Sequence, residues 1–129
     1  CAKCAAPHMK KQKYGNIINM SSQAGKSGGL INGLPYGSSK AGLIGLTKGL
    51  AREMAPYNVR VNCICPGRIS TPDNLKVPRA FHKKTLQQIP LGRLGSVGEI
   101  AAGVLFLVSD ESSYITGEIM DINGGWLMD

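Results

Sequence analysis

The sequence predicts an α/β protein built on a parallel sheet. Short apolar runs with the composition of strands alternate along the 129 residues with segments of helical periodicity. Strands that alternate with helices usually pair in parallel, with the helices on the faces of the sheet. The hydrophobic fraction is 43% and only 5% of the residues are aromatic, so we expect an aliphatic core. A chain of this length forms one domain at most and can bury a core.

The first element expected is the end of a helix over residues 1–13, which has an apolar face of small side chains and no capping residue before it. The chain is therefore expected to begin inside a helix. A strand over Gly15–Met20 follows and ends at two hydroxyl residues, Ser21 and Ser22. The next segment, residues 23–35, is rich in glycine and is expected to be irregular.

The longest helix is expected over residues 36–55 and should end before a proline. Leu43, Leu46, Leu50 and Met54 recur at spacings of three and four, which predicts a stripe that packs on the core. Small residues recur every four positions on another face of this helix. We expect that face to admit the close approach of a second helix or strand.

A second strand is expected over Val59–Cys65 and ends at Pro66 and Gly67. The connection that follows, residues 68–92, contains three prolines and a predicted short helix over residues 79–88. A connection of this length in a small domain is usually functional, often as a lid over a site.

The last helix expected begins at a capping box, in which Ser96 and Glu99 satisfy each other's backbone donors. A last strand over residues 118–122 then ends at Asn123. In a parallel sheet of this kind, ligands bind beyond the carboxyl ends of the strands. The three strand ends should therefore meet at the edge where the long helix begins.

Composition and charge argue against several classes of partner. The net charge is +7, but the basic residues are scattered and no aromatic residues interleave with them, so we expect no nucleic-acid partner. No run approaches eighteen apolar residues, so we expect no membrane span. The first residues lack the apolar run and cleavage site of a signal peptide, and we expect a cytoplasmic protein.

The four cysteines are expected to be free thiols, as is usual in a reducing cytoplasm. Cys63 and Cys65 lie in an apolar strand, where cysteine behaves as a small hydrophobic residue. Cys1 and Cys4 have the spacing of half a zinc site, but the other half is missing from the sequence. We therefore expect no metal.

Three residues near the predicted edge form a candidate catalytic group: Ser22, Tyr36 and Lys40. Tyr36 and Lys40 are four residues apart, so on a helix they share a face. A free phenol titrates near pH ~10, and a neighbouring ammonium favours the phenolate, which makes tyrosine a usable general acid or base. Ser22 would donate a hydrogen bond to a substrate carbonyl and stabilise the charge that develops there. Ser21 is the competing choice for this role.

The turn after the second strand is a candidate ligand-binding segment. With Ile69 and Thr71 following, the backbone at Pro66 and Gly67 could face an amide of a ligand, and Thr71 a phosphate. The alternative is that Pro66 and Gly67 only terminate the strand.

Taken together, these motifs resemble the short-chain dehydrogenase/reductase family. The matching segments are Ile-Ile-Asn-Met-Ser21-Ser22, Tyr36-Gly-Ser-Ser-Lys40, Val-Arg-Val-Asn62, Pro66-Gly-Arg-Ile69-Ser-Thr71 and Asn123-Gly-Gly. The resemblance covers essentially the whole chain and corresponds to the carboxyl-terminal half of a usual member. It implies a Rossmann-like, doubly wound parallel sheet, of which residues 1–129 hold the last three strands and their flanking helices.

The resemblance implies an oxidoreductase that uses NAD or NADP to interconvert a small-molecule alcohol and ketone. Tyr36 would be the general acid/base, Lys40 would bind the nicotinamide ribose and favour the phenolate, and Ser22 would orient the substrate oxygen. The cofactor-binding residues would be Tyr36, Lys40, Pro66, Gly67, Ile69 and Thr71. Residues 70–90 would form a lid over the substrate. A homo-dimer or homo-tetramer is expected, and both a 3-oxoacyl thioester and a sugar or polyol stay open as substrates.

The chain departs from the family pattern in lacking the amino-terminal features. The Thr-Gly-x-x-x-Gly-x-Gly turn for the pyrophosphate, the residue that selects NAD or NADP, the Asn-Ala-Gly segment and the catalytic asparagine would all lie before Cys1. The loop from Ser22 to Tyr36 is also one residue longer than the commonest family spacing. We therefore expect the 129 residues alone to be inactive. The alternative to an enzyme is a fragment that only self-associates or packs with the missing half.

Overall fold

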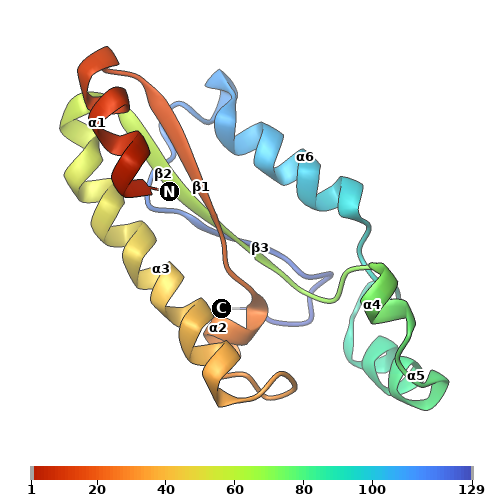
Figure 1. The fold of residues 1–129 in the computed structure, drawn as a ribbon. Coiled ribbons are helices and arrows are strands. Elements are labelled where there is room, and N and C mark those ends of the chain that lie inside the picture. The colour runs from red at the N-terminus through yellow and green to blue at the C-terminus, as the bar shows by residue number, and fades with distance from the viewer. Residues whose placement is uncertain (1, 129) are drawn as a thin grey trace.

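The computed structural model shows a parallel sheet with helices on both faces (Figure 1). It describes residues 2–128, except for the side chains of Leu75 and Arg79. The strands lie in the order β1-β2-β3 and are β1 (Gly15–Met20), β2 (Val59–Pro66) and β3 (Ile119–Ile122). The predicted α/β class and parallel sheet are confirmed.

Helices connect and flank these strands in the predicted alternation. They are α1 (Ala2–Gln12), α2 (Gln23–Ser27), α3 (Leu34–Met54), α4 (Pro72–Leu75), α5 (Arg79–Gln88) and α6 (Val97–Val108). Single 3-10 turns lie at Ala55–Tyr57 and Asp110–Ser112. In Figure 1, α1 and α3 lie on one side of the sheet and α6 on the other. No helix within residues 2–128 is long and apolar enough to span a bilayer.

Strand β2 is the centre of the core because both of its faces are covered. Val61 points to the α3 side, where it packs with Ala51 and Met54. Ile64 points to the other side, where it packs with Leu107 of α6. Val61, Met54, Ile64 and Leu107 are all fully buried. A strand covered on both faces reads as a nearly continuous apolar run, which explains why its position was predictable.

The predicted core stripe of the long helix is wrong at Leu46, which is 48% exposed. The buried face of α3 is formed by Gly37, Thr47, Ala51 and Met54 instead. Thr47 is a polar residue that the sheet accommodates, because its hydroxyl donates to the Leu43 carbonyl oxygen (2.7 Å) and accepts from Asn19 Nδ2 (2.9 Å). Periodicity identifies an apolar stripe but not which side of the helix meets the chain's own sheet.

The small residues of α3 also face outward. Apart from the adjoining residues of α3 itself, a Cβ added at Gly45 or Gly49 would have no atom of the described residues within 4 Å. The close neighbour expected at this face is therefore not an element within residues 2–128. Together with Leu46, these glycines leave an apolar strip along α3 that the rest of the described chain does not cover.

Two short helices occur where the sequence predicted an irregular loop or no helix. Ser22 begins α2 by accepting a hydrogen bond from Ala24 N at 3.1 Å, and Gly28 ends it with a φ of 77°. Thr71 begins α4 in the same way, with its hydroxyl accepting from Asn74 N at 3.3 Å. Both helices are single turns, too short for periodicity to reveal.

The side chain of Asn62 fixes the path of the chain into β3. Asn62 is fully buried in β2; its Nδ2 donates to the Ile115 carbonyl oxygen (3.0 Å), and its Oδ1 accepts from Glu118 N (3.0 Å). These two bonds hold the segment before β3 against β2. They therefore help to set the register in which Pro66 is opposite Ile122.

Candidate active site

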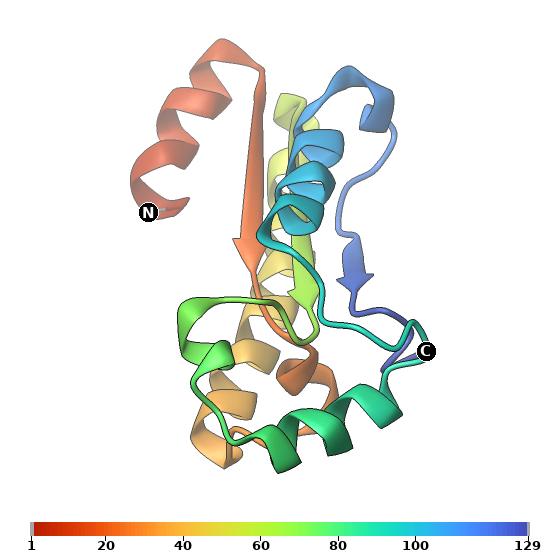
Figure 2. The same ribbon diagram turned by 90° about the vertical axis from the view of Figure 1, so that its right-hand side faces the viewer.

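The carboxyl ends of the three strands point to one end of the molecule, as predicted. In Figure 2 the three arrowheads point toward the side where α4 and α5 lie. Ser21 follows β1, Pro66 ends β2, and Asn123 follows β3. Helix α3 begins at the same edge, with Tyr36 in its first turn.

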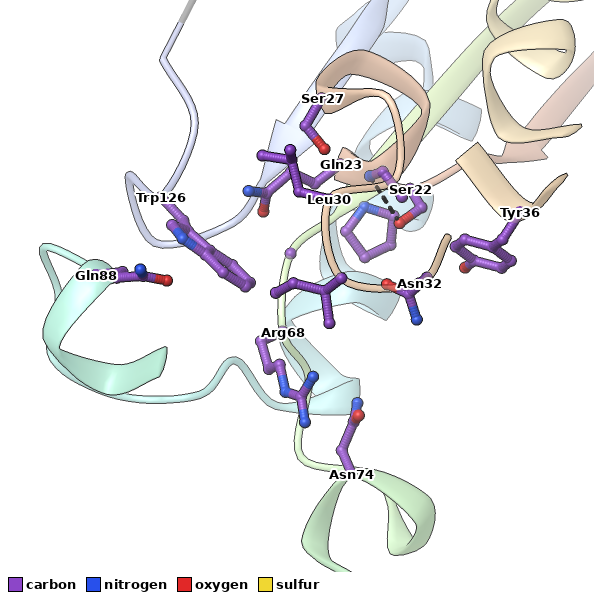
Figure 3. Close-up of a pocket in the computed structure, with 14 residues that line it drawn as sticks. Ser22, Gln23, Ser27, Leu30, Asn32, Tyr36, Arg68, Asn74, Gln88 and Trp126 are labelled. Atoms are coloured by element: carbon purple, nitrogen blue, oxygen red, sulfur yellow. Dashed lines mark hydrogen bonds between the residues drawn. The ribbon is translucent and has the colours of Figure 1, made fainter. Parts of the chain in front are cut away.

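A cavity of about 630 Å³ lies at this edge and is lined by Ser22, Tyr36, Pro66 and Gly67 (Figure 3). Its volume lies within the roughly 300–1,000 Å³ typical of small-molecule sites. The remaining lining residues come from α2, the loop before α3, the turn after β2, α4, α5 and the carboxyl-terminal segment: Gln23, Ala24, Ser27, Leu30, Ile31, Asn32, Arg68, Asn74, Gln88 and Trp126.

Tyr36 and Lys40 lie side by side on α3, as their spacing predicts. The Nζ atom of Lys40 is 5.6 Å from the centroid of the Tyr36 ring. The same Nζ donates a hydrogen bond to the Met20 carbonyl oxygen at 2.9 Å. Tyr36 is 39% exposed and lines the cavity, whereas Lys40 lies beside Tyr36 and outside the cavity lining. A positive charge is therefore fixed next to a phenol that faces an open site.

The two competing serines have different surroundings. Ser21 is 5% exposed, and its hydroxyl donates to the carbonyl oxygen of Lys40 at 2.7 Å. Ser22 lines the cavity, and its hydroxyl oxygen accepts a hydrogen bond from Ala24 N. Figure 3 shows this bond and places Ser22 on the same side of the cavity as Tyr36. Ser21 thus ties β1 to α3, and Ser22 faces the space that a ligand would fill.

Of the four ligand-binding residues predicted in and after the turn that follows β2, two line the cavity and two do not. Pro66 and Gly67 line the cavity. Gly67 also approaches the next strand end so closely that an added Cβ would lie 2.7 Å from Asn123 Cα. Ile69 is 9% exposed and packs in the core on the α6 side, while the Thr71 hydroxyl caps α4. The structure does not bring the side chains of Ile69 and Thr71 into the cavity.

The loop before α3 folds back on the first turn of that helix. Gly33 N donates to Gly29 O at 2.8 Å, and Gly37 N donates to Gly33 O at 3.1 Å. A Cβ at Gly37 would lie 2.8 Å from the backbone of Gly28 and Gly29, so only glycine allows this contact. Between these anchors, Leu30 is 88% exposed and forms part of the cavity wall.

Sequence reasoning missed several residues of the cavity, above all Arg68. It lies between Gly67 and Ile69, which were both predicted to bind a ligand, and this position in the sequence could have indicated it. Trp126 was not among the predicted site residues either, and it lines the cavity. Gln88 and Asn74 come from the segment predicted as a lid. That segment therefore does form one wall of the site.

Comparison with known proteins identifies relatives along the whole chain. A family model described as "Enoyl-(Acyl carrier protein) reductase" matches residues 1–127. The 3-oxoacyl-(acyl-carrier-protein) reductase of Thermotoga maritima is 49% identical over 121 residues, which cover 92% of this chain and 48% of that protein. The Dehydrogenase/reductase SDR family member 6 of Rattus norvegicus is 41% identical over 130 residues, covering 96% of this chain and 53% of that protein.

Solved structures give the same result. A 3-oxoacyl-(acyl-carrier protein) reductase from Brucella melitensis superposes with a TM-score of 0.95 at 38% identity, covering 98% of this chain and 48% of that one. A second structure of such a reductase from this organism, with bound NAD, gives a TM-score of 0.90 at 38% identity, with coverage of 98% and 47%. The chain spans about half the length of the curated relatives it matches. The family model covers nearly every residue, and the chain belongs to the short-chain dehydrogenase/reductase family.

Proposed function

We propose that this chain is the carboxyl-terminal part of a single Rossmann-fold domain in an NAD(P)-dependent oxidoreductase that interconverts an alcohol and a ketone. The observation that carries the proposal is the shared cavity of Ser22 and Tyr36 at the strand ends, with the Lys40 ammonium 5.6 Å from the tyrosine ring. The names of its relatives support it, because they include reductases and a (3R)-3-hydroxyacyl-CoA dehydrogenase of Canis lupus familiaris.

The residues present fit the nicotinamide end of NAD or NADP. The Lys40 ammonium has three N–H donors, one of which is used by Met20 O, and the others suit ribose hydroxyls. Pro66 and Gly67 would hold the nicotinamide at the end of β2, and the Thr71 hydroxyl, which accepts from Asn74 N, can donate its proton to a phosphate. Ile69 would contribute only its backbone, since its side chain is buried. When bound, the cofactor supplies a hydride to the ketone or accepts one from the alcohol.

Ser22 and Tyr36 would handle the substrate oxygen. Because Ser22 Oγ already accepts from Ala24 N, its own proton can be donated to the carbonyl oxygen, which polarises the C=O bond. In reduction, the carbonyl carbon gains the hydride while Tyr36 gives its phenolic proton to the oxygen, and the alcohol forms. In oxidation, Tyr36 takes that proton back. The Lys40 ammonium stabilises the phenolate that remains after the proton is given.

We also propose that the protein works in the cytoplasm as a homo-dimer or homo-tetramer. The uncovered strip on α3 supports self-association, because Leu46 is 48% exposed there beside Gly45 and Gly49. Small residues on a helix face allow another helix to approach closely. Sedimentation of the complete protein, with Leu46→Glu as the variant, measures this assembly directly.

Replacement of Tyr36 by phenylalanine tests the proposed activity. In the complete protein, Tyr36→Phe should reduce turnover by about 10²–10⁴-fold, the usual contribution of a general acid or base. The dissociation constant of the cofactor should stay near the wild-type value. Tyr114→Phe is the matched control, since Tyr114 is fully exposed. The assay should include a 3-oxoacyl thioester and a sugar among its substrates. A Tyr36→Phe enzyme with wild-type turnover would refute the assignment.

A further inference from the structure

The guanidinium of Arg68 has buried donors that no described residue accepts. Arg68 follows Gly67 and lines the same cavity as Ser22 and Tyr36. Its Nε and Nη2 atoms are buried, and neither has a hydrogen-bond partner. Buried polar groups in folded proteins are nearly always paired, and an unpaired one calls for an explanation such as a ligand. A charged donor left unpaired is more costly than a neutral one.

Neighbouring residues hold this guanidinium in place. Its central carbon lies 4.8 Å from the centroid of the Phe81 ring on α5, which is a cation–π contact. In Figure 3, Arg68 extends toward Asn74 of α4, whose Nδ2 donates to the Ile69 carbonyl oxygen at 2.8 Å. Burial lowers the pKa of Arg68, but a guanidinium stays protonated at neutral pH. Arg68 is therefore a positive charge with two unpaired donors, and a ligand would reach these donors through a local shift of the segments that cover them.

The charge of Arg68 is not compensated within this cavity. Among the lining residues that the structure describes, none is acidic and Arg68 alone carries a formal charge at neutral pH. Arg68 also lines a second cavity that holds Glu99 and Asp121, but these carboxylates are paired with Arg93 and Lys26. Adjacent N–H donors of a planar guanidinium match the geometry of a carboxylate, which they bind in a bidentate manner. The site is thus suited to a ligand that brings its own negative charge.

We propose that Arg68 binds the acidic group of the substrate, so that the protein acts on oxo acids and the corresponding hydroxy acids. This inference rests on the proposed function, because it uses the same cavity. In Figure 3, Ser22 and Tyr36 lie on one side of the view and Arg68 and Asn74 on the other. The ketone would lie at Ser22 and Tyr36 while the carboxylate lies at Arg68. A cofactor phosphate is the other source of an oxyanion, and the test separates the two.

The first experiment compares acids with their neutral esters in the complete protein. The substrates are short oxo acids in which one to three methylene groups separate the ketone from the carboxylate, each paired with its methyl ester. The wild-type enzyme should prefer at least one acid over its ester. Arg68→Gln should reduce kcat/KM for that acid by about 10- to 100-fold, as expected for a lost charged hydrogen bond. The value of kcat/KM for the ester should change by less than about threefold.

The matched control is Arg52→Gln, which removes the same charge from an exposed position on α3. This variant should retain the preference for the acid. Arg68→Lys keeps the charge but loses the planar pair of donors, so its preference for the acid should lie between those of the wild-type protein and Arg68→Gln. Circular dichroism melting checks that each variant is folded; if Arg68→Gln does not fold, the wild-type preference and Arg68→Lys decide the question.

A binding measurement tests the inference without turnover. Each hydroxy acid and its neutral amide are titrated by calorimetry into the protein that holds reduced cofactor, a combination that cannot react. Wild-type protein should bind a hydroxy acid more tightly than its amide, and Arg68→Gln should remove this difference. The inference is overturned if the wild-type protein does not prefer the acid form in either assay. It is also overturned if Arg68→Gln instead raises the dissociation constant of the cofactor, which would assign Arg68 to a cofactor phosphate.

The two proposals fail in different ways. If esters are reduced as well as acids and Tyr36→Phe removes both activities, the proposed oxidoreductase stands and the role of Arg68 is wrong. If no ketone is reduced but hydroxy acids bind through Arg68, the acidic ligand stands and the proposed reaction is wrong.

Discussion

The Nζ atom of Lys40 donates a hydrogen bond to the Met20 carbonyl oxygen at 2.9 Å, which ties the first turns of α3 to the last residue of β1. Ser21, the next residue, donates from its hydroxyl to the Lys40 carbonyl oxygen at 2.7 Å. The strand end and the helix are therefore joined in both directions at one residue. This joint fixes the ammonium beside Tyr36.

We predict that Lys40→Ala harms cofactor binding and turnover together, unlike Tyr36→Phe. The change removes the donors proposed for the ribose and the charge that stabilises the phenolate. Cofactor titration by calorimetry and steady-state kinetics on the complete protein measure the two effects separately. Lys48→Ala is the control, because Lys48 is exposed further along α3. A Lys40→Ala enzyme with wild-type cofactor affinity would contradict the role proposed for the ammonium.

The two serines are predicted to separate activity from stability. Ser22→Ala should lower turnover strongly, and loss of the cap on α2 should also reduce the free energy of unfolding by about 0.5–2 kcal/mol. Ser21→Ala should reduce the free energy of unfolding by about 1 kcal/mol, because a hydrogen bond to α3 is lost. Its effect on turnover should be smaller than that of Ser22→Ala. Kinetics and denaturant melts of both variants check this. The opposite pattern, with Ser21→Ala inactive and Ser22→Ala active, would reassign the catalytic serine.

The segment over residues 70–90 is predicted to become ordered when ligands bind. It holds α4 and α5 and contributes Asn74 and Gln88 to the cavity wall, so a bound substrate would add contacts to it. Hydrogen exchange of the complete protein with and without cofactor and substrate should show increased protection in this segment and little change in β2. Equal protection in the two states would argue against a lid.

The chain of 129 residues by itself is predicted to self-associate and to lack cofactor affinity. Within the described residues, β1 is an edge strand, and its outer backbone groups are open to pairing with another chain. The contacts with pyrophosphate and adenosine that supply much of the affinity would also be missing. Sedimentation and calorimetric titration with NAD(H) and NADP(H) are the measurements. A monomer that binds either cofactor at micromolar concentration would show that this half is self-sufficient.

Much of the fold was predictable from local sequence. The bounds of β1 and of α5 agree with the prediction, and the Ser96 capping box is confirmed. The short helix α2 was not predicted, because one turn held by a serine cap carries no periodic signal. The outward position of Leu46 was not predictable either, since it depends on which side of α3 meets the sheet.

The candidate site was predictable to the extent that topology creates it. Ser22, Tyr36, Pro66 and Gly67 come together because the ends of parallel strands meet at one edge. The missed residue, Arg68, became recognisable only through its tertiary surroundings. That its donors are buried and without partners depends on segments such as the one carrying Phe81, which are distant in sequence.

The glycine contacts between the loop before α3 and its first turn leave one wall of the cavity free to vary. Gly29, Gly33 and Gly37 clamp the base of the loop by backbone contacts, while Leu30 and Ile31 between them are exposed and line the cavity. Substitutions at these two positions can reshape the cavity without moving Tyr36. Under the proposed function, this segment is therefore the place where evolution, or a designer, can change which substrates are accepted while the proton transfer at Tyr36 is kept.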